Sequence, residues 1–214
     1  MFISVLISAC SYPPLKNEPV GTFSDYSYQI GSGDGVSIFV WDNPDISTTV
    51  TVRPDGKITV PLVEDLLVTG QTPYQVARKL EEVYRKFIRD PQVVVMMTAF
   101  QGVDSQQIRV IGQISGSGGG GNRSGGGGGG GRGSNAYQAL TLPYERGMTL
   151  LDVIIRIGSI GEFADGNRAS ILRKVNGVQK RYSVKLDDLV EDADISENVS
   201  MLPGDILIIP EAFF

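Results

Sequence analysis

The 214-residue sequence contains no histidine and only one cysteine. The absence of histidine excludes Ser-His-Asp and Cys-His catalysis, imidazole metal ligation and the usual proton shuttle near neutral pH. One cysteine cannot form an intramolecular disulfide or a thiolate zinc site. We therefore expect no metal and no cofactor, and an enzyme with this sequence would depend on carboxylate, hydroxyl or lysine chemistry.

Long apolar runs and an excess of basic residues are also missing. No run of about 18 apolar residues occurs, so the sequence predicts no transmembrane helix. The 19 Lys and Arg are outnumbered by 24 Asp and Glu, which argues against a nucleic-acid binder. At 41% hydrophobic and 20% charged residues, the composition is typical of a globular protein.

Glycine is the residue type in excess. Thirteen of the 27 glycines lie between Gly116 and Gly133. The remaining 14 are an ordinary share for the rest of the chain. The sequence therefore predicts a flexible Gly-rich insertion over residues 115–134.

The first ten residues are mostly apolar and end at Cys10, after which the chain becomes polar and Pro-rich. This junction resembles a bacterial lipoprotein signal, in which cleavage before the cysteine precedes its lipidation. The apolar stretch is short and lacks a basic start, so we expect the true start codon upstream. Residues 1–22 are then a truncated leader and a tether; the alternative is an ordinary helix or strand that contains a cysteine.

A first α+β unit is predicted over residues 23–100. Alternation from Val36 to Trp41 predicts a buried strand after a Gly-rich turn. The sequence Arg53-Pro54-Asp55-Gly56 predicts a type I turn that joins residues 48–52 and 57–62 as a hairpin.

A helix and a closing strand complete this unit. Thr72 and Gln75 predict a capping box, with Pro73 at the first helical position. Residues 92–98 predict a strand that is apolar on both faces. The predicted buried stripe of the helix is Val76, Leu80, Val83 and Phe87.

A second unit is predicted over residues 107–212, interrupted by the Gly-rich insertion. Thr149, with Asp152 three positions later, caps a short helix. Asn176-Gly177 predicts a two-residue hairpin turn, and residues 205–210 form a last strand. Strands around a short helix predict an α+β class and suggest a ubiquitin-like β-grasp topology.

One short pattern recurs in both units. Gly33-Asp34 and Gly204-Asp205 each come directly before an apolar strand. Glycine permits a tight turn, and an aspartate beside it can brace that turn through the backbone. We therefore interpret both aspartates as turn residues rather than as an acidic site.

Taken together, these landmarks resemble the polysaccharide export (Wza-like) outer-membrane lipoproteins, and are closest to the exosortase-associated exopolysaccharide export branch. The resemblance spans most of the chain outside the insertion. It rests on Tyr28-Gln29-Ile30-Gly31-x-Gly33-Asp34, Val40-Trp41, Val52-Arg53-Pro54-Asp55-Gly56-Lys57-Ile58, Pro61-Leu62, Asp90-Pro91-Gln92-Val93, Val110-Ile111-Gly112-Gln113, Thr149-Leu150-Leu151-Asp152-Val153, Phe163-Ala164-Asp165-Gly166-Asn167-Arg168 and Leu202-Pro203-Gly204-Asp205 through Glu211-Ala212-Phe213-Phe214.

The resemblance implies a polysaccharide export domain followed by a soluble-ligand-binding β-grasp domain. It also implies a homo-oligomeric ring, lipid-anchored at the periplasmic face of the outer membrane. The expected partners are an exopolysaccharide chain and an inner-membrane chain-length regulator with its polymerase. Larger relatives add a C-terminal pore helix, which the sequence lacks, so we expect a separate outer-membrane β-barrel as a further partner.

Two charged blocks follow one another near the end of the chain. Residues 166–186 contain six cations and no acid, and residues 187–197 contain six acids and no cation. A ring could pair the basic block of one subunit with the acidic block of the next; the alternative is a solvated hairpin and loop. The expected interface residues are Arg173, Lys174, Lys180, Arg181, Asp187, Asp188 and Glu191.

Three functions fit these observations. The leading one is a non-enzymatic export component that guides a glycan outward. The second is a periplasmic glycan-active enzyme with paired carboxylates, for which Asp42, Asp45 and Asp187 are candidates. The third is a passive glycan-binding β-grasp module.

Overall fold

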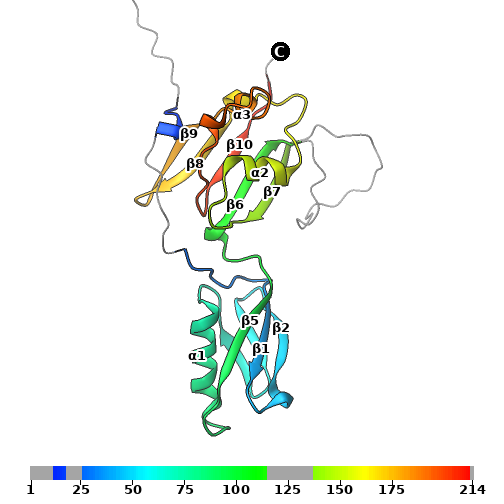
Figure 1. Ribbon diagram of the computed structural model, residues 1–214. Helices are drawn as coiled ribbons and strands as arrows, with labels where there is room; N and C mark the ends of the chain where they lie inside the picture. Colours follow the sequence, from blue (N-terminus) through cyan, green and yellow to red (C-terminus); the bar gives the residue numbers. More distant parts are fainter. Residues whose placement is uncertain (1–11, 18–25, 115–136, 213–214) are drawn as a thin grey trace, which may run out of the picture. The chain divides into compact units, whose positions relative to one another are not determined.

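The computed structural model describes residues 12–17, 26–114 and 137–212. These residues form two compact units. The first unit takes residues 23–108 and 142–146, and the second takes the N-terminal segment and the remainder of the chain. Both units combine helices with sheets (Figure 1), as the α+β prediction requires.

The first unit is a three-stranded antiparallel sheet, a strand pair and one helix. The sheet has the order β2-β1-β5, and a separate antiparallel pair joins β3 to β4. The elements are β1 (Gly35–Val40), β2 (Thr48–Thr51), β3 (Lys57–Val60), β4 (Val63–Leu67), α1 (Pro73–Tyr84) and β5 (Val93–Ala99), with short 3-10 turns at Pro44–Ile46 and Asp104–Gln106.

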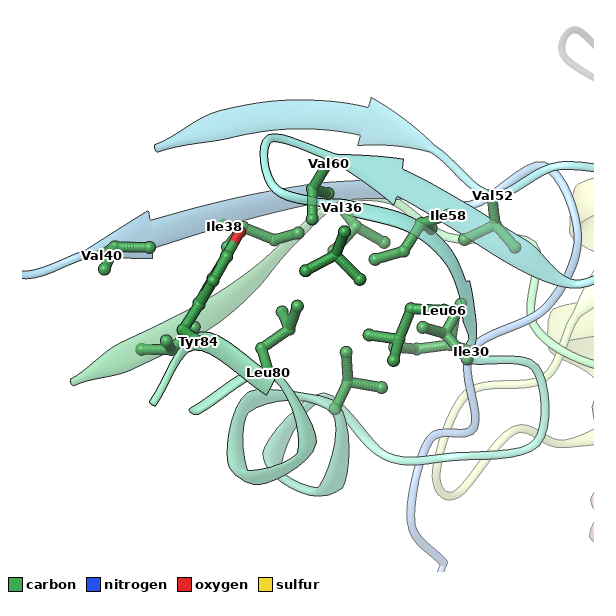
Figure 2. Close-up of a cluster of buried hydrophobic side chains, with 14 residues drawn as sticks. Ile30, Val36, Ile38, Val40, Val52, Ile58, Val60, Leu66, Leu80 and Tyr84 are labelled. Carbon is green, nitrogen blue, oxygen red and sulfur yellow. The ribbon is translucent and has the colours of Figure 1, made fainter. Parts of the chain in front are cut away.

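Helix α1 begins where the sequence predicts. The Thr72 hydroxyl accepts a hydrogen bond from the Gln75 backbone, and the Gln75 side chain accepts one from the Thr72 backbone. Figure 2 shows Leu80 and Tyr84 of the helix pointing toward Ile38 of β1. All three side chains are almost fully buried, so apolar contacts hold the helix on the sheet.

Three details of this unit differ from the prediction. The turn at Arg53 to Gly56 is present, but β2 pairs with β1 and β3 pairs with the unpredicted β4, so the two flanking strands do not form a hairpin. Phe87 lies beyond the end of α1 and is 57% exposed. The outer face of β5 is exposed at Val94 and Met96, so the strand is buried on one face only.

The second unit is a five-stranded sheet with the order β7-β6-β10-β8-β9. Strand β10 pairs in parallel with β6 and antiparallel with β8, and β8 forms a hairpin with β9 across Asn176-Gly177, as predicted. The elements are β6 (Gln107–Gln113), β7 (Tyr137–Pro143), α2 (Leu150–Ile157), β8 (Ser170–Val175), β9 (Val178–Ser183), α3 (Leu186–Val190) and β10 (Ile206–Ile209), with 3-10 turns at Leu15–Asn17, Gly166–Arg168 and Ile195–Glu197.

The N-terminal residues 12–17 pack against this second unit. Pro14 forms a parallel bridge with Ser183 at the edge of the sheet, and Leu15 is only 3% exposed. The sequence predicts these residues as part of a tether. The structure adds that residues 12–17 are held on the fold by burial of an apolar side chain and by main-chain pairing.

Candidate functional site

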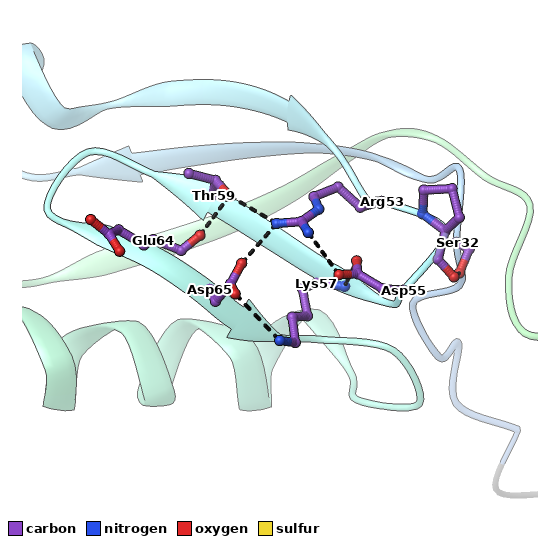
Figure 3. Close-up of polar contacts among 8 residues, drawn as sticks. Ser32, Arg53, Asp55, Lys57, Thr59, Glu64 and Asp65 are labelled. Atoms are coloured by element: carbon purple, nitrogen blue, oxygen red, sulfur yellow. Dashed lines mark hydrogen bonds and ion pairs between the residues drawn. The ribbon is translucent and has the colours of Figure 1, made fainter.

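The candidate site in the first unit is a polar network on the surface of the β3–β4 pair. Figure 3 shows Arg53 between two carboxylates. Its guanidinium donates to Asp65 Oδ1 at 2.7 Å and to Asp55 Oδ2 at 2.8 Å, and Lys57 Nζ lies 3.4 Å from the other oxygen of Asp65. Thr59 takes part by donating its hydroxyl to the backbone oxygen of Glu64.

The local sequence explains how these charges meet. Gly56, with a φ of +76°, closes the turn by donating to the Arg53 carbonyl, so Arg53 and Lys57 are brought onto neighbouring positions. The hydrogen bonds from Arg53 and then Lys57 lower the pKa of Asp65. Asp65 is therefore ionised at neutral pH, held by Arg53 and Lys57.

A second feature of the first unit is the buried carboxylate of Asp34. It accepts hydrogen bonds from the backbone of Gly31 at 2.8 Å and of Gly102 at 3.0 Å, and from Gln101. The Tyr28 hydroxyl donates to it at 2.6 Å, and burial, followed by this hydrogen bond, raises the pKa of Tyr28. Asp34 therefore joins the turn before β1 to the segment that leaves β5.

The second unit contains a matching carboxylate at Asp205. It accepts a hydrogen bond from the backbone of Leu202, three residues earlier, as Asp34 does from Gly31. The turn interpretation of both aspartates is confirmed. Asp205 has a further role, because Arg173 Nη2 lies 2.6 Å from its Oδ2 and Arg173 Nε lies 3.0 Å from its Oδ1. Burial raises the pKa of Asp205, and the guanidinium of Arg173 opposes that rise.

This ion pair corrects part of the predicted charge interface. The Arg173 side chain is 9% exposed and also donates to the Ser200 carbonyl, so it is not a surface cation that a neighbouring subunit can contact. Arg181 is also engaged within the chain: it donates to Ser170 Oγ and to the Tyr12 hydroxyl, and lies 4.4 Å from the centre of the Tyr12 ring.

The acidic half of the predicted interface is partly engaged too. Asp187 accepts a hydrogen bond from the Asn167 backbone, and Asp188 forms a 2.8 Å ion pair with Lys185. Lys174, Lys180 and Glu191 are exposed. Within the described ranges, the side chains of these three residues form no hydrogen bond or ion pair.

The carboxylates considered for glycan hydrolysis lie on different elements. Asp42 follows β1 and Asp45 lies in the next 3-10 turn, and both are exposed. Asp187 belongs to the second unit. Glycosidases raise the pKa of their acid by enclosing it in an apolar environment, and the exposure of Asp42 and Asp45 does not provide one.

Other predictions from the sequence concern metals, membranes and segments without an assigned structure. Among the described residues, no group of three or more metal-ligating side chains converges. None of the helices in those ranges combines the length and apolarity needed to cross a membrane. The lipidation candidate Cys10 and the insertion 115–134 lie outside the described residues.

Sequence reasoning missed two features of these sites. It did not predict the pairing of Arg53 with Asp65, because the strand that carries Asp65 was not predicted. It also missed Asp205 as the partner of Arg173, although alternation along β8 gave a signal. Arg173 shares a face with the fully buried Ile171, and a cation on a buried face requires a counter-charge.

Comparison with known proteins agrees with the resemblance. Residues 23–98 match the family model described as polysaccharide biosynthesis/export protein. The EPS I polysaccharide export outer membrane protein EpsA of Ralstonia nicotianae is 24% identical over 203 residues, covering 84% of this chain and 46% of that protein. The protein of the same name from Ralstonia solanacearum is 29% identical over 114 residues, covering 42% of this chain and 29% of that protein. The chain spans less than half the length of these relatives.

Proposed function

We propose that this Wza-like polysaccharide export protein, whose residues 23–98 are a polysaccharide export domain, acts as a non-enzymatic component of exopolysaccharide export. In this role it forms or adapts a periplasmic conduit to the outer membrane, and no bond of the glycan is made or broken. The observation that carries the proposal is the family match over residues 23–98. Residues of its motifs form the Arg53 network and the hydrogen bonds around the Asp34 carboxylate.

The proposed partners follow from the same family. They are an exopolysaccharide chain, an inner-membrane chain-length regulator with its polymerase, and an outer-membrane β-barrel. The names of the two relatives support the polysaccharide and the outer membrane. The second unit serves as a soluble-ligand-binding β-grasp domain, and several copies of the chain assemble as a ring.

The proposed location is the periplasmic face of the outer membrane, with lipid on Cys10. The support is the position of the chain's single cysteine directly after an apolar segment. Mass spectrometry of protein purified from its host, expressed from its native gene, should find an acylated N-terminal Cys10. A free Cys10 thiol in an unprocessed chain would contradict the anchor while leaving the export role open.

The interface between oppositely charged surfaces of neighbouring subunits remains a prediction, now with fewer residues. Of its seven residues, Lys174, Lys180 and Glu191 are exposed, and their side chains form no hydrogen bond or ion pair within the described part of the chain. A head-to-tail contact would have to use these three. Its charges would be screened at high salt, because the Debye length falls from about 10 Å at 0.1 M to about 3 Å at 1 M.

Purified full-length chain incubated with the exopolysaccharide of its host tests the non-enzymatic part. We expect no new reducing ends above a buffer control. If reducing ends appear, Asp42→Asn and Asp45→Asn variants would show whether these carboxylates produce them. Loss of the new ends in either variant would replace the export role by glycan hydrolysis.

A further inference from the structure

The three-stranded sheet of the first unit has a buried face and an exposed face. The inward side chains of β1, such as Ile38, belong to the buried cluster that also contains residues of α1, β3 and β4 (Figure 2). Because side chains alternate along a strand, Ser37 and Phe39 point to the opposite face. Phe39 is 41% exposed, and Trp41, the next position on that side, is 65% exposed.

The strand register brings side chains of all three strands onto this exposed face. Phe39 of β1 lies opposite Val94 of β5, and Ser37 lies between Thr49 of β2 and Met96 of β5. Partners that face each other across neighbouring strands have Cβ atoms only about 5 Å apart, so these side chains form one continuous surface. We call this surface the outer face; it consists of Ser37, Phe39, Trp41, Thr49, Val94 and Met96.

Aromatic rings and hydroxyl groups follow one another along the outer face. The rings of Phe39 and Trp41 meet edge to face, with their centres 6.3 Å apart and their planes at 80°. Further along β1, the Thr49 hydroxyl donates a hydrogen bond to Ser37 Oγ at 3.2 Å. The Ser37 hydroxyl can still donate its own proton, and both oxygens keep lone pairs for a ligand.

Charge is missing from the strands that form this face. Strands β1, β2 and β5 contain no Asp, Glu, Lys or Arg, although 20% of the chain is charged. The charged residues that follow Trp41 are the exposed acids Asp42 and Asp45. A surface without cations and with acids at one end disfavours nucleic acid and anionic phospholipid, and is complementary to an uncharged ligand.

We propose that the outer face binds neutral sugar residues of a glycan chain, and this inference rests on the proposed role in exopolysaccharide export. One side of a pyranose ring carries C–H groups, which pack on the electron-rich face of an aromatic ring such as Trp41. The rim of the sugar carries hydroxyl groups, which exchange hydrogen bonds with Ser37 and Thr49. A wholly apolar partner would instead remove these two hydroxyls from water without replacing their hydrogen bonds.

The fluorescence of Trp41 tests this directly, because it is the single tryptophan of the chain. Full-length protein is titrated with oligosaccharides prepared by partial cleavage of the exopolysaccharide of its host. We expect a saturable shift of the emission to shorter wavelength and weaker quenching by acrylamide. The affinity should be the same at 0.1 M and 1 M salt, because screening does not weaken contacts between uncharged groups.

Substitutions on and off the outer face separate binding from a change in the fold. Phe39→Ala keeps the fluorescent reporter and should weaken binding about five- to tenfold. Trp41→Ala, followed by calorimetry, should weaken it at least as much, and Trp41→Phe should retain part of the affinity. The matched control is Tyr74→Ala, which removes an exposed aromatic ring from α1 and should change nothing. Circular dichroism checks that each variant is folded.

Three results would overturn the inference. They are unchanged Trp41 emission and quenching at the highest oligosaccharide concentration, an unchanged affinity in Phe39→Ala, and protection of Trp41 from acrylamide that grows with protein concentration in the absence of glycan. The last result would assign the outer face to a contact between copies of the chain. None of them bears on the export role itself, which fails only if a strain without the gene secretes its polysaccharide normally.

Discussion

Replacing Arg173 with methionine should destabilise the second unit strongly. The substitution keeps the length of the apolar stem but leaves the Asp205 carboxylate, which is 1% exposed, without its counter-charge. Breaking a buried ion pair by removing one partner costs about 3–5 kcal/mol. For an m value of about 2 kcal/mol per molar, the urea midpoint should fall by roughly 2 M.

The pH dependence of this cost has a definite sign. Burial already raises the pKa of Asp205 in the folded protein, and removing the guanidinium raises it further. A carboxyl with a raised folded pKa binds more protons in the native than in the unfolded state, so its contribution to stability falls as pH rises from about 4 through the folded pKa. The cost of Arg173→Met should therefore be largest at pH 7 and should shrink toward pH 5.

The assay is urea unfolding of both proteins, followed by circular dichroism at pH 7 and pH 5. Lys180→Met is the matched control, because Lys180 is the cross-strand partner of Arg173 but is exposed. It should leave the midpoint nearly unchanged. If Arg173→Met shifts the midpoint no more than Lys180→Met does, the buried pair does not hold this unit together. A cost that grows toward pH 5 would refute the ionisation argument.

Three further substitutions test other parts of the fold. Asp34→Asn replaces one acceptor oxygen by a donor group facing backbone N–H groups, so it should cost about 2–4 kcal/mol in urea unfolding, whereas the exposed Asp42→Asn should cost little. Gly112→Ala should destabilise more than Gly177→Ala in thermal unfolding: both glycines have a positive φ, but a Cβ at Gly112 would overlap the backbone oxygen of Ile209, whereas a Cβ at Gly177 would meet open space. Replacing residues 116–133 by four residues should keep or slightly raise the melting temperature, because halving a loop changes closure entropy by only about 0.6 kcal/mol; a lost thermal transition would show that this segment is needed for folding.

Local sequence determined the features that were predicted correctly. The capping boxes at Thr72 and Thr149 are confirmed, because each depends on residues three positions apart. The β8–β9 hairpin is confirmed for the same reason, since its turn needs only Asn176-Gly177. Asp34 and Asp205 brace turns because their nearest donors lie three residues before them.

Contacts between distant residues explain the failures. Arg173 was counted as a surface charge, but its partner is 32 residues away in sequence. Residues 12–17 have no periodic pattern, and their position depends on contacts with Ser183, which lies 171 residues after Tyr12. Strand β2 pairs with β1 and not with β3. Alternation of apolar residues predicts that a segment is a strand, but it does not specify which strand it pairs with.

The export claim is tested most directly by deleting the gene in its host and following labelled exopolysaccharide by fraction. The account predicts that polymer in the medium falls, that polymer retained in the cell envelope rises with unchanged sugar composition, and that full-length protein restores secretion. Normal secretion by the deletion strain would contradict the export role and would favour a passive glycan-binding module.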